Sequence, residues 1–286
     1  MRYGYYIIKH VIKTNAKGKS MKINRNKLFR TILCVALAGA LVTGIARPVE
    51  AAAKTKKSKA AKKVVIVLDP GHDTTHHGCT YDSFDEGSAN LSIAMYCKQE
   101  LETYKGVSVY LTRTTLDCPY GADPASSQGC LAGRVNFAKS LGAAAIVSLH
   151  NDYDGDLDAS QCGSKIIIPN PFYRQDVCLT GFGLAQSILP QLTATGLSIN
   201  NWKLMPNGTG IVMRNSSVST YPDGTPKDYY ALINKAKSVG IPCIIVEHAY
   251  CTNPSDLQNH LSTQAQLQEL GVADARGIAA YYGLSK

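Results

Sequence analysis

Three short apolar runs, each followed closely by a side chain that can carry chemistry, constrain the fold of this chain most. The runs are 64–68 (VVIVL), 143–149 (AAAIVSL) and 241–246 (IPCIIV). Their length and β-branched content predict buried strands. His72 follows the first run after an Asp-Pro-Gly turn, and His150 and Glu247 follow the other two directly. If the strands are parallel, these three side chains share one edge of a sheet, where α/β proteins place their ligands.

Helical patterns alternate with strands along the rest of the chain. Apolar spacing predicts helices at about 88–104, 131–142, 182–196, 229–240 and 263–282, and further strands at 107–111 and 165–168. The irregular stretch 200–224 is long enough to form a binding loop, a lid or a small hairpin. We therefore predict a single α/β domain with a twisted, mostly parallel central sheet and helices on both faces.

The N-terminal part is typical of a targeting region. A basic n-region follows Met21, an apolar h-region covers 31–45, and small residues follow at 51–53. The h-region is shorter than the ~20 apolar residues that usually span a bilayer, which favours cleavage. We expect residues 1–53 to form an N-terminal extension and secretory signal peptide, with Met21 as an alternative start. The protein would then be secreted, meeting the membrane only transiently during export.

The formal net charge of +9 arises from this N-terminal region. Residues 1–50 carry ten Lys or Arg and one acidic residue, and the segment 54–63 (KTKKSKAAKK) adds six lysines. The remaining domain, 64–286, has fourteen basic and twenty acidic side chains, a formal charge of −6. This distribution argues against a nucleic-acid-binding protein. We expect 54–63 to be a solvated linker, with contact to an anionic polymer as the alternative.

Nine cysteines are present, of which Cys34 lies in the signal. The remaining eight are an even number, which permits disulfides in an exported chain. Cys118 and Cys130 flank a loop rich in Gly, Pro and Ser, and we predict that they pair. No pair has C-x-x-C spacing, so a cysteine zinc knuckle is not indicated.

His72 and His150 are candidate metal ligands, because catalytic zinc takes three protein ligands from His and Asp or Glu. The residue pattern leaves four candidates for a third, oxygen ligand: Glu86, Asp73, Asp85 and Glu247. His76 and His77 compete, but the preceding Pro-Gly makes a helix there improbable and favours a loop. The alternating aspartates of 152–158 lack the glycine and the final glutamate at the offsets that a calcium loop requires, so a solvated acidic loop is favoured.

Four motifs in order resemble a known family. They are the opening LDPGH at 68–72, a glutamate five residues before a helix leucine (Glu86, Leu91), an arginine-bearing helix (Arg134) leading to Ser-x-His (148–150), and a strand, glutamate, aromatic and Asn-Pro at 246–254. Together they resemble the zinc-dependent N-acetylmuramoyl-L-alanine amidases, which cleave bacterial peptidoglycan. The resemblance covers about 64–284. It departs from the family at His76 and His77, which replace small residues, and at Tyr250 and Cys251.

The resemblance implies that Zn²⁺ is held by His72, Glu86 and His150, and that Glu247 is the catalytic glutamate. The expected reaction is hydrolysis of the amide between N-acetylmuramic acid and L-alanine, by an autolysin-like, wall-associated monomer. Contact of its linker with an anionic wall polymer is the alternative to a solvated linker.

Three further residues are candidates for substrate binding, although each has an ordinary alternative. Arg134 lies on an amphipathic helix, where packing or local pairing is favoured, and Asn151 and Asn253 are equally suited to loop or cap roles. Two other functions are alternatives to the amidase. One is an exported zinc peptidase acting on stem peptides, and the other is a non-catalytic wall-binding protein.

Overall fold

The computed structural model describes four stretches of the chain: 63–121, 125–158, 160–200 and 208–286. The predicted signal peptide (1–53) and all of the predicted linker except Lys63 lie outside the described residues. In the described part, no helix is both long and apolar enough to cross a membrane.

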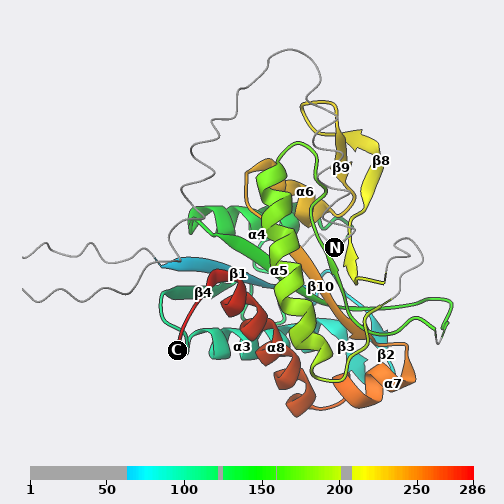
Figure 1. Ribbon diagram of the computed structural model, residues 1–286. Helices are drawn as coiled ribbons and strands as arrows, with labels where there is room; N and C mark the ends of the chain where they lie inside the picture. The colour runs from blue at the N-terminus through cyan, green and yellow to red at the C-terminus, as the bar shows by residue number, and fades with distance from the viewer. Residues whose placement is uncertain (1–62, 122–124, 159, 201–207) are drawn as a thin grey trace, which may run out of the picture. The chain divides into compact units, whose positions relative to one another are not determined.

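A six-stranded sheet forms the centre of the domain (Figure 1). In spatial order its strands are β4 (Val107–Leu111), β1 (Val64–Pro70), β5 (Ala145–Asp152), β10 (Cys243–Tyr250), β6 (Lys165–Ile167) and β7 (Ile211–Val212). The first four strands run parallel to one another, and β6 is antiparallel to β10. The predicted α/β class, with a mostly parallel sheet, is confirmed.

Helices cover both faces of the sheet, as predicted. On one side lie α3 (Glu86–Leu101), α5 (Gln175–Thr193) and α8 (Gln264–Tyr282), and on the other α4 (Gln128–Ser140) and α6 (Ala231–Ser238). Side chains alternate between the faces of a strand. In β1, Ile66 and Leu68 therefore belong to the larger apolar cluster, while Val67 belongs to the cluster under α4 and α6.

In the described part of the chain, four smaller elements lie outside the central sheet and its five covering helices. They are the hairpin of β2 (Thr80–Tyr81) and β3 (Phe84–Asp85), the hairpin of β8 (Asn215–Thr220) and β9 (Pro226–Asp228), the short helix α7 (Pro254–Asp256) and the π-helical turn η1 (Leu257–Leu261). The hairpin predicted as one option for 200–224 is thus partly confirmed, while 201–207 lie outside the described residues.

Two strands extend further than the apolar runs indicated. His150 was expected just after its strand, but it is the sixth residue of β5, and Glu247 is the fifth residue of β10. The ladder between these strands includes the pair Glu247–His150 and, after a register shift, the pair Tyr250–Asp152. Backbone pairing, rather than apolar side chains, extends these strands, and it places both side chains on the sheet itself.

Two glycines of α8 let this helix approach its neighbours closely. A Cβ at Gly271 would lie 2.5 Å from the Ile93 carbonyl oxygen of α3, and one at Gly277 would lie 2.5 Å from Ile188 Cα of α5. These obstacles are backbone atoms, which cannot rotate away. The helix layer therefore depends on the absence of a side chain at both positions.

We predict that Gly271→Ala lowers the free energy of unfolding by about 1–3 kcal/mol, because α3 and α8 must move apart to admit the methyl group. Gly129→Ala in α4 is the matched control, since a Cβ at Gly129 would have nothing within 4 Å of it in the described part of the chain. The control should be neutral or slightly stabilising. Urea unfolding midpoints measure both, and equal midpoints would contradict the packing argument.

Candidate functional site

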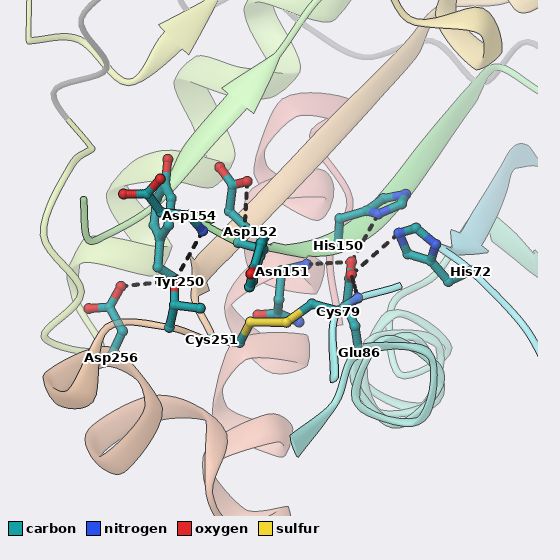
Figure 2. Close-up of a disulfide and its surroundings, with 12 residues drawn as sticks. His72, Cys79, Glu86, His150, Asn151, Asp152, Asp154, Tyr250, Cys251 and Asp256 are labelled. Carbon is teal, nitrogen blue, oxygen red and sulfur yellow. Dashed lines mark hydrogen bonds and ion pairs between the residues drawn. A yellow bond between two sulfur atoms is a disulfide. The ribbon is translucent and has the colours of Figure 1, made fainter. Parts of the chain in front are cut away.

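Three predicted side chains converge at the carboxyl ends of the central strands (Figure 2). His72 Nε2 lies 3.3 Å from Glu86 Oε2, and His150 Nδ1 lies 3.2 Å from Glu86 Oε1. The two imidazoles meet edge to face, with ring centroids 4.9 Å apart. One ligand atom from each residue lies within 4.8 Å of the others, so the group can hold a metal ion. The structure therefore brings together the two histidines and, of the four carboxylates considered, Glu86.

Each member is placed by a different local feature. His72 follows β1 with a φ of 61°, a left-handed conformation that turns the chain sharply away from the strand. Glu86 is the first residue of α3, whose N-cap is Asp85, a side chain that accepts a hydrogen bond from Ser88 N. His150 projects from β5. Asp85 is thus used for capping.

Two glycines leave room for this group. A Cβ at Gly71 would lie 2.2 Å from the His150 ring, and one at Gly78 would lie 2.4 Å from Glu86 Oε2 and 2.7 Å from the His72 ring. These contacts are far below van der Waals separation. The glycines are therefore part of the site's construction, because a side chain at either position would collide with the group.

Glu86 is almost completely buried and surrounded by donors. Its Oε2 accepts a hydrogen bond from Cys79 N at 2.9 Å, and its Oε1 accepts bonds from Asn90 Nδ2 and Asn151 N, both at 3.2 Å. Burial alone would raise the pKa of Glu86, but the hydrogen bonds and charges of His150 and His72 outweigh it and lower the pKa well below the usual value. Glu86 is held as a carboxylate, the form that binds metal.

The pKa values of His150 and His72 shift in opposite directions, although both side chains contact Glu86. Burial lowers the pKa of His150, which favours its neutral form. For His72, burial also acts to lower the pKa, but the hydrogen bond and charge of Glu86 outweigh it and raise the pKa. Metal ligation requires neutral imidazole, so binding a cation here would release any proton that His72 carries.

Glu247 lies beside this group between two strands. It is opposite His150 of β5 on one side and opposite Lys165 of β6 on the other. Its Oε2 is buried and accepts no hydrogen bond within the described part of the chain. Burial raises the pKa of Glu247 to about 7, with Lys165 opposing the shift and Glu86 adding to it. Such a carboxyl group can take up and release a proton near neutral pH.

Two cavities share Glu247 in their walls. One, of about 490 Å³, is also lined by His72, Glu86 and His150. The other, of about 410 Å³, is lined by the acidic loop 152–158 and by two cationic side chains, Lys165 and Arg214. Asp152 and Tyr153 border both. The arrangement leaves space for a substrate on either side of Glu247.

Arg134, a predicted substrate contact, is buried beneath the site. Its guanidinium donates to Asp69 Oδ1 at 2.7 Å, to Asp73 Oδ2 at 3.0 Å and to the Pro70 carbonyl at 2.8 Å. Structural packing and pairing, rather than substrate contact, account for all of these contacts, but the expected surface position and local partners were wrong, since Arg134 is buried and its partners lie more than 60 residues away. The arginine fixes the turn that presents His72.

The two asparagines also make local contacts. Asn151 donates from its backbone to Glu86 and from its side chain to Asn90 Oδ1 at 2.9 Å, and it lines the cavity of the three-residue group. Asn253 caps α7 by accepting from Ser255 N and Asp256 N. The cap role foreseen for Asn253 is confirmed, and contact of these residues with substrate stays a prediction.

The disulfide differs from the predicted one. Cys79, in the loop between His72 and Glu86, is bonded to Cys251, which follows β10 (Figure 2). Cys118 and Cys130 are thiols whose sulfurs lie 3.2 Å apart, so their proximity was predicted correctly but their bond was not. The prediction rested on the position of Cys118 and Cys130 at the two ends of one loop. The bonded cysteines are 172 residues apart in the sequence, and only the fold brings them together.

Some residues of the site carried no signal in the sequence. Gly78 and Asn90 contact Glu86 from a loop and from the next turn of α3, and neither belongs to a recognisable motif. Lys165 was placed on a strand, but only the antiparallel pairing with β10 sets it opposite Glu247. These positions follow from the tertiary structure alone.

A mostly parallel sheet with two histidines near the carboxyl ends of its central strands, and a glutamate that joins them from the start of α3, defines an α/β enzyme able to hold a metal at that edge. Within that class, the chain belongs to the N-acetylmuramoyl-L-alanine amidase family, which it matches over residues 66–280. The enzyme class expected from the four motifs is confirmed. No curated protein matches this sequence.

Solved structures share the fold at low sequence identity. Ami1 from Mycobacterium smegmatis is 20% identical with a TM-score of 0.60, covering 78% of this chain and 98% of that one. The CwlD amidase from Clostridioides difficile, solved in complex with the GerS lipoprotein, is 20% identical with a TM-score of 0.58 over 77% and 99%. Cwp6 from Clostridium difficile is 22% identical with a TM-score of 0.58, and this chain covers 30% of its length.

We predict that Gly78→Ala weakens metal binding at the three-residue group about 10–100-fold, because its methyl group would displace the Glu86 carboxylate and the His72 ring. Gly87→Ala is the matched control in the same site, since its Cβ would make only ordinary contacts of 3.7 Å and longer. Calorimetric titration of the metal-free proteins with Zn²⁺ measures the difference. Equal affinities for the two variants would contradict the crowding argument.

We predict that Asp69→Asn lowers the free energy of unfolding at pH 7 by about 3–5 kcal/mol, because it removes one partner of a buried ion pair. Burial would raise the pKa of Asp69, but Arg134, Thr112 and Ser148 outweigh it and lower the pKa below 3.8. A depressed carboxyl pKa stabilises the fold above its unfolded value and loses that effect as pH falls through the folded value.

The difference between wild type and Asp69→Asn should therefore be constant at neutral pH and shrink below about pH 4, the ordinary range of an aspartate. Denaturant unfolding across pH 3–8 measures this dependence. A difference that stays unchanged at low pH would show that Asp69 does not act through its charge.

Proposed function

We propose that this protein hydrolyses the amide bond between N-acetylmuramic acid and L-alanine in peptidoglycan, with Zn²⁺ bound by His72, Glu86 and His150. The observation that carries the proposal is the convergence of these three side chains beside Glu247, in a chain of the amidase family. Glu247 is the proposed general base and acid.

The residues present fit a catalytic zinc ion. Two imidazoles and one carboxylate are a donor set used by catalytic zinc sites, which leave a further position open for water or substrate. Here the three donor side chains line a cavity of about 490 Å³, which gives water or substrate a route to the site. Gly71 and Gly78 leave a cradle that a Cβ would fill, and Glu86 is held as a carboxylate by its surroundings.

A zinc ion bound by His72, Glu86 and His150 would supply Lewis acidity for the scissile carbonyl and for the attacking water. Glu247, whose Oε2 has no competing hydrogen bond from the described residues, takes the proton from that water. The same carboxyl group then returns the proton to the leaving nitrogen of L-alanine. A pKa of about 7 suits both transfers, because neither the charged nor the neutral form is strongly favoured.

The chain's own residues keep this geometry fixed during the reaction. Asn90 and Asn151 donate to Glu86, and the Cys79–Cys251 disulfide joins the loop between His72 and Glu86 to the end of β10 (Figure 2). Glu247 lies on β10, the strand that Cys251 directly follows. The disulfide thus ties the segment that carries His72 and Glu86 to the strand that carries Glu247, and the pairing of β5 with β10 holds His150 beside them.

The place of action follows from the expected export. We propose a secreted, wall-associated monomer, supported by the signal-like segment in 1–53 and by the lysine-rich segment 54–63, which suits contact with an anionic wall polymer. Arg134 serves in this proposal by positioning the turn before His72, while Asn151 lines the substrate cavity and Asn253 holds the loop after β10.

We predict that Glu247→Gln lowers the rate of peptidoglycan hydrolysis at least ~100-fold while leaving zinc content unchanged, because it removes the proton carrier but no ligand. His72→Ala should lose the zinc ion of this three-residue group together with activity. Glu269→Gln, an exposed glutamate of α8, is the matched control and should be fully active. Unchanged digestion by Glu247→Gln would favour a non-catalytic or differently catalysed role.

The products distinguish an amidase from a stem-peptide peptidase that uses the same zinc ligands. Mass spectrometry of a wild-type digest should show glycan strands without peptide, together with intact stem peptides that carry a new N-terminal L-alanine. New amino termini at other positions of the stem peptide would identify the peptidase instead.

A further inference from the structure

A second group of metal-ligating side chains lies next to the proposed zinc site but shares no residue with it. Its members are Asp73, His76, Cys118 and Cys130, and one ligand atom from each lies within 4.8 Å of the others. Asp73 and His76 belong to the loop after β1, Cys118 to the loop after β4, and Cys130 to the first turn of α4. Three separate segments therefore converge on one point.

Short distances connect the four side chains. The sulfurs of Cys118 and Cys130 are 3.2 Å apart, His76 Nδ1 is 3.0 Å from Asp73 Oδ1, and Cys130 Sγ is 3.8 Å from Asp73 Oδ2. Asp73 and Cys130 are buried, whereas His76 and Cys118 are partly exposed. The group thus lies at the edge of the buried interior, with two of its members reaching solvent.

We propose that Asp73, His76, Cys118 and Cys130 bind a second zinc ion. Two sulfurs, an imidazole nitrogen and a carboxylate oxygen complete a tetrahedral set, and soft thiolates select zinc over Ca²⁺ or Mg²⁺. Zinc–sulfur bonds of ~2.3 Å place two thiolates roughly 3.8 Å apart on one ion. The present 3.2 Å separation is closer to that value than to the ~2.05 Å of a disulfide.

Arg134 lies against the charge that such a site creates. Two thiolates and one carboxylate with a divalent ion carry one net negative charge, and the Arg134 guanidinium, which also pairs with Asp69, contacts two of these ligands. Arg134 donates from Nε to Cys130 Sγ at 3.2 Å and from Nη2 to Asp73 Oδ2 at 3.0 Å. A cation that contacts two ligands in this way also orients them. Binding releases the thiol protons to solvent.

The ion would be structural, because four protein donors leave no open position. It would fasten the loop that carries Cys118 and the first turn of α4 to the segment that directly follows His72. This inference goes beyond the proposed reaction and does not depend on it, since the two sites have separate ligands.

Zinc content tests the proposal. The full chain is equilibrated with Zn²⁺ without reductants or chelators, freed of unbound metal, and measured by plasma mass spectrometry. Wild type should hold two zinc ions, Cys118→Ser and Cys130→Ser one each, and Cys118→Ser combined with His72→Ala none. Cys162→Ser is the matched control, a partly exposed thiol outside the group, and should keep two.

Cobalt substitution adds a readout that does not depend on stoichiometry or activity. Co²⁺ bound by thiolate gives an ultraviolet charge-transfer band, which should persist in His72→Ala and vanish in Cys118→Ser, with circular dichroism showing that both variants are folded. If His72→Ala keeps the wild-type zinc count while Cys118→Ser loses one ion, the proposed catalytic site fails and this inference stands.

Two results would overturn the second site. One is a Cys118→Ser variant that binds as much zinc as wild type. The other is a Cys118–Cys130 disulfide in the unreduced peptide map of the zinc-equilibrated wild type, because a disulfide has no thiolate to offer.

Discussion

The turn after the first strand is held by two buried arginines, and both clusters of ligands depend on that turn. Arg113 donates to the carbonyl oxygens of Pro70 and Gly71. Arg134 reaches from α4 to Asp69 before the turn and to Asp73 after it. Removing one partner of such a buried pair typically costs about 3–5 kcal/mol, a large share of a domain's net stability. His72, at a φ of 61°, stands between the two aspartates and is fixed by neither sheet nor helix. The ion pairs therefore supply the order that regular secondary structure does not.

A second constraint comes from the sheet. The parallel register of β1, β5 and β10 brings His72, His150 and Glu247 to one edge. Neighbouring strands lie about 4.8 Å apart, which matches the spacing needed for side chains that share a ligand. Glu86 then enters from the start of α3, where the helix N-terminus favours a carboxylate. Backbone geometry sets the spacing, and side-chain hydrogen bonds complete it.

The fold class and the three-residue group were predictable because each rests on a local signal. Apolar runs located the strands, and the residues after them located the sheet edge. The resemblance to the amidases, rather than spacing, selected Glu86 from four carboxylates, and the structure places it between the imidazoles. The extents of β5 and β10 were underestimated, because polar residues such as His150 continue the backbone ladder without any apolar signal.

What was missed depends on contacts between distant segments. Cys79 and Cys251 are bonded across 172 residues, and a pattern read along the chain favoured the nearer pair Cys118–Cys130 instead. That nearer pair lies close to Asp73 and to Arg134, so its environment is one of charged, metal-ligating groups. Cysteine spacing alone therefore does not show whether two cysteines form a disulfide or bind a metal. Two sulfurs lie close together in both cases, and the other metal-ligating side chains around them distinguish the two.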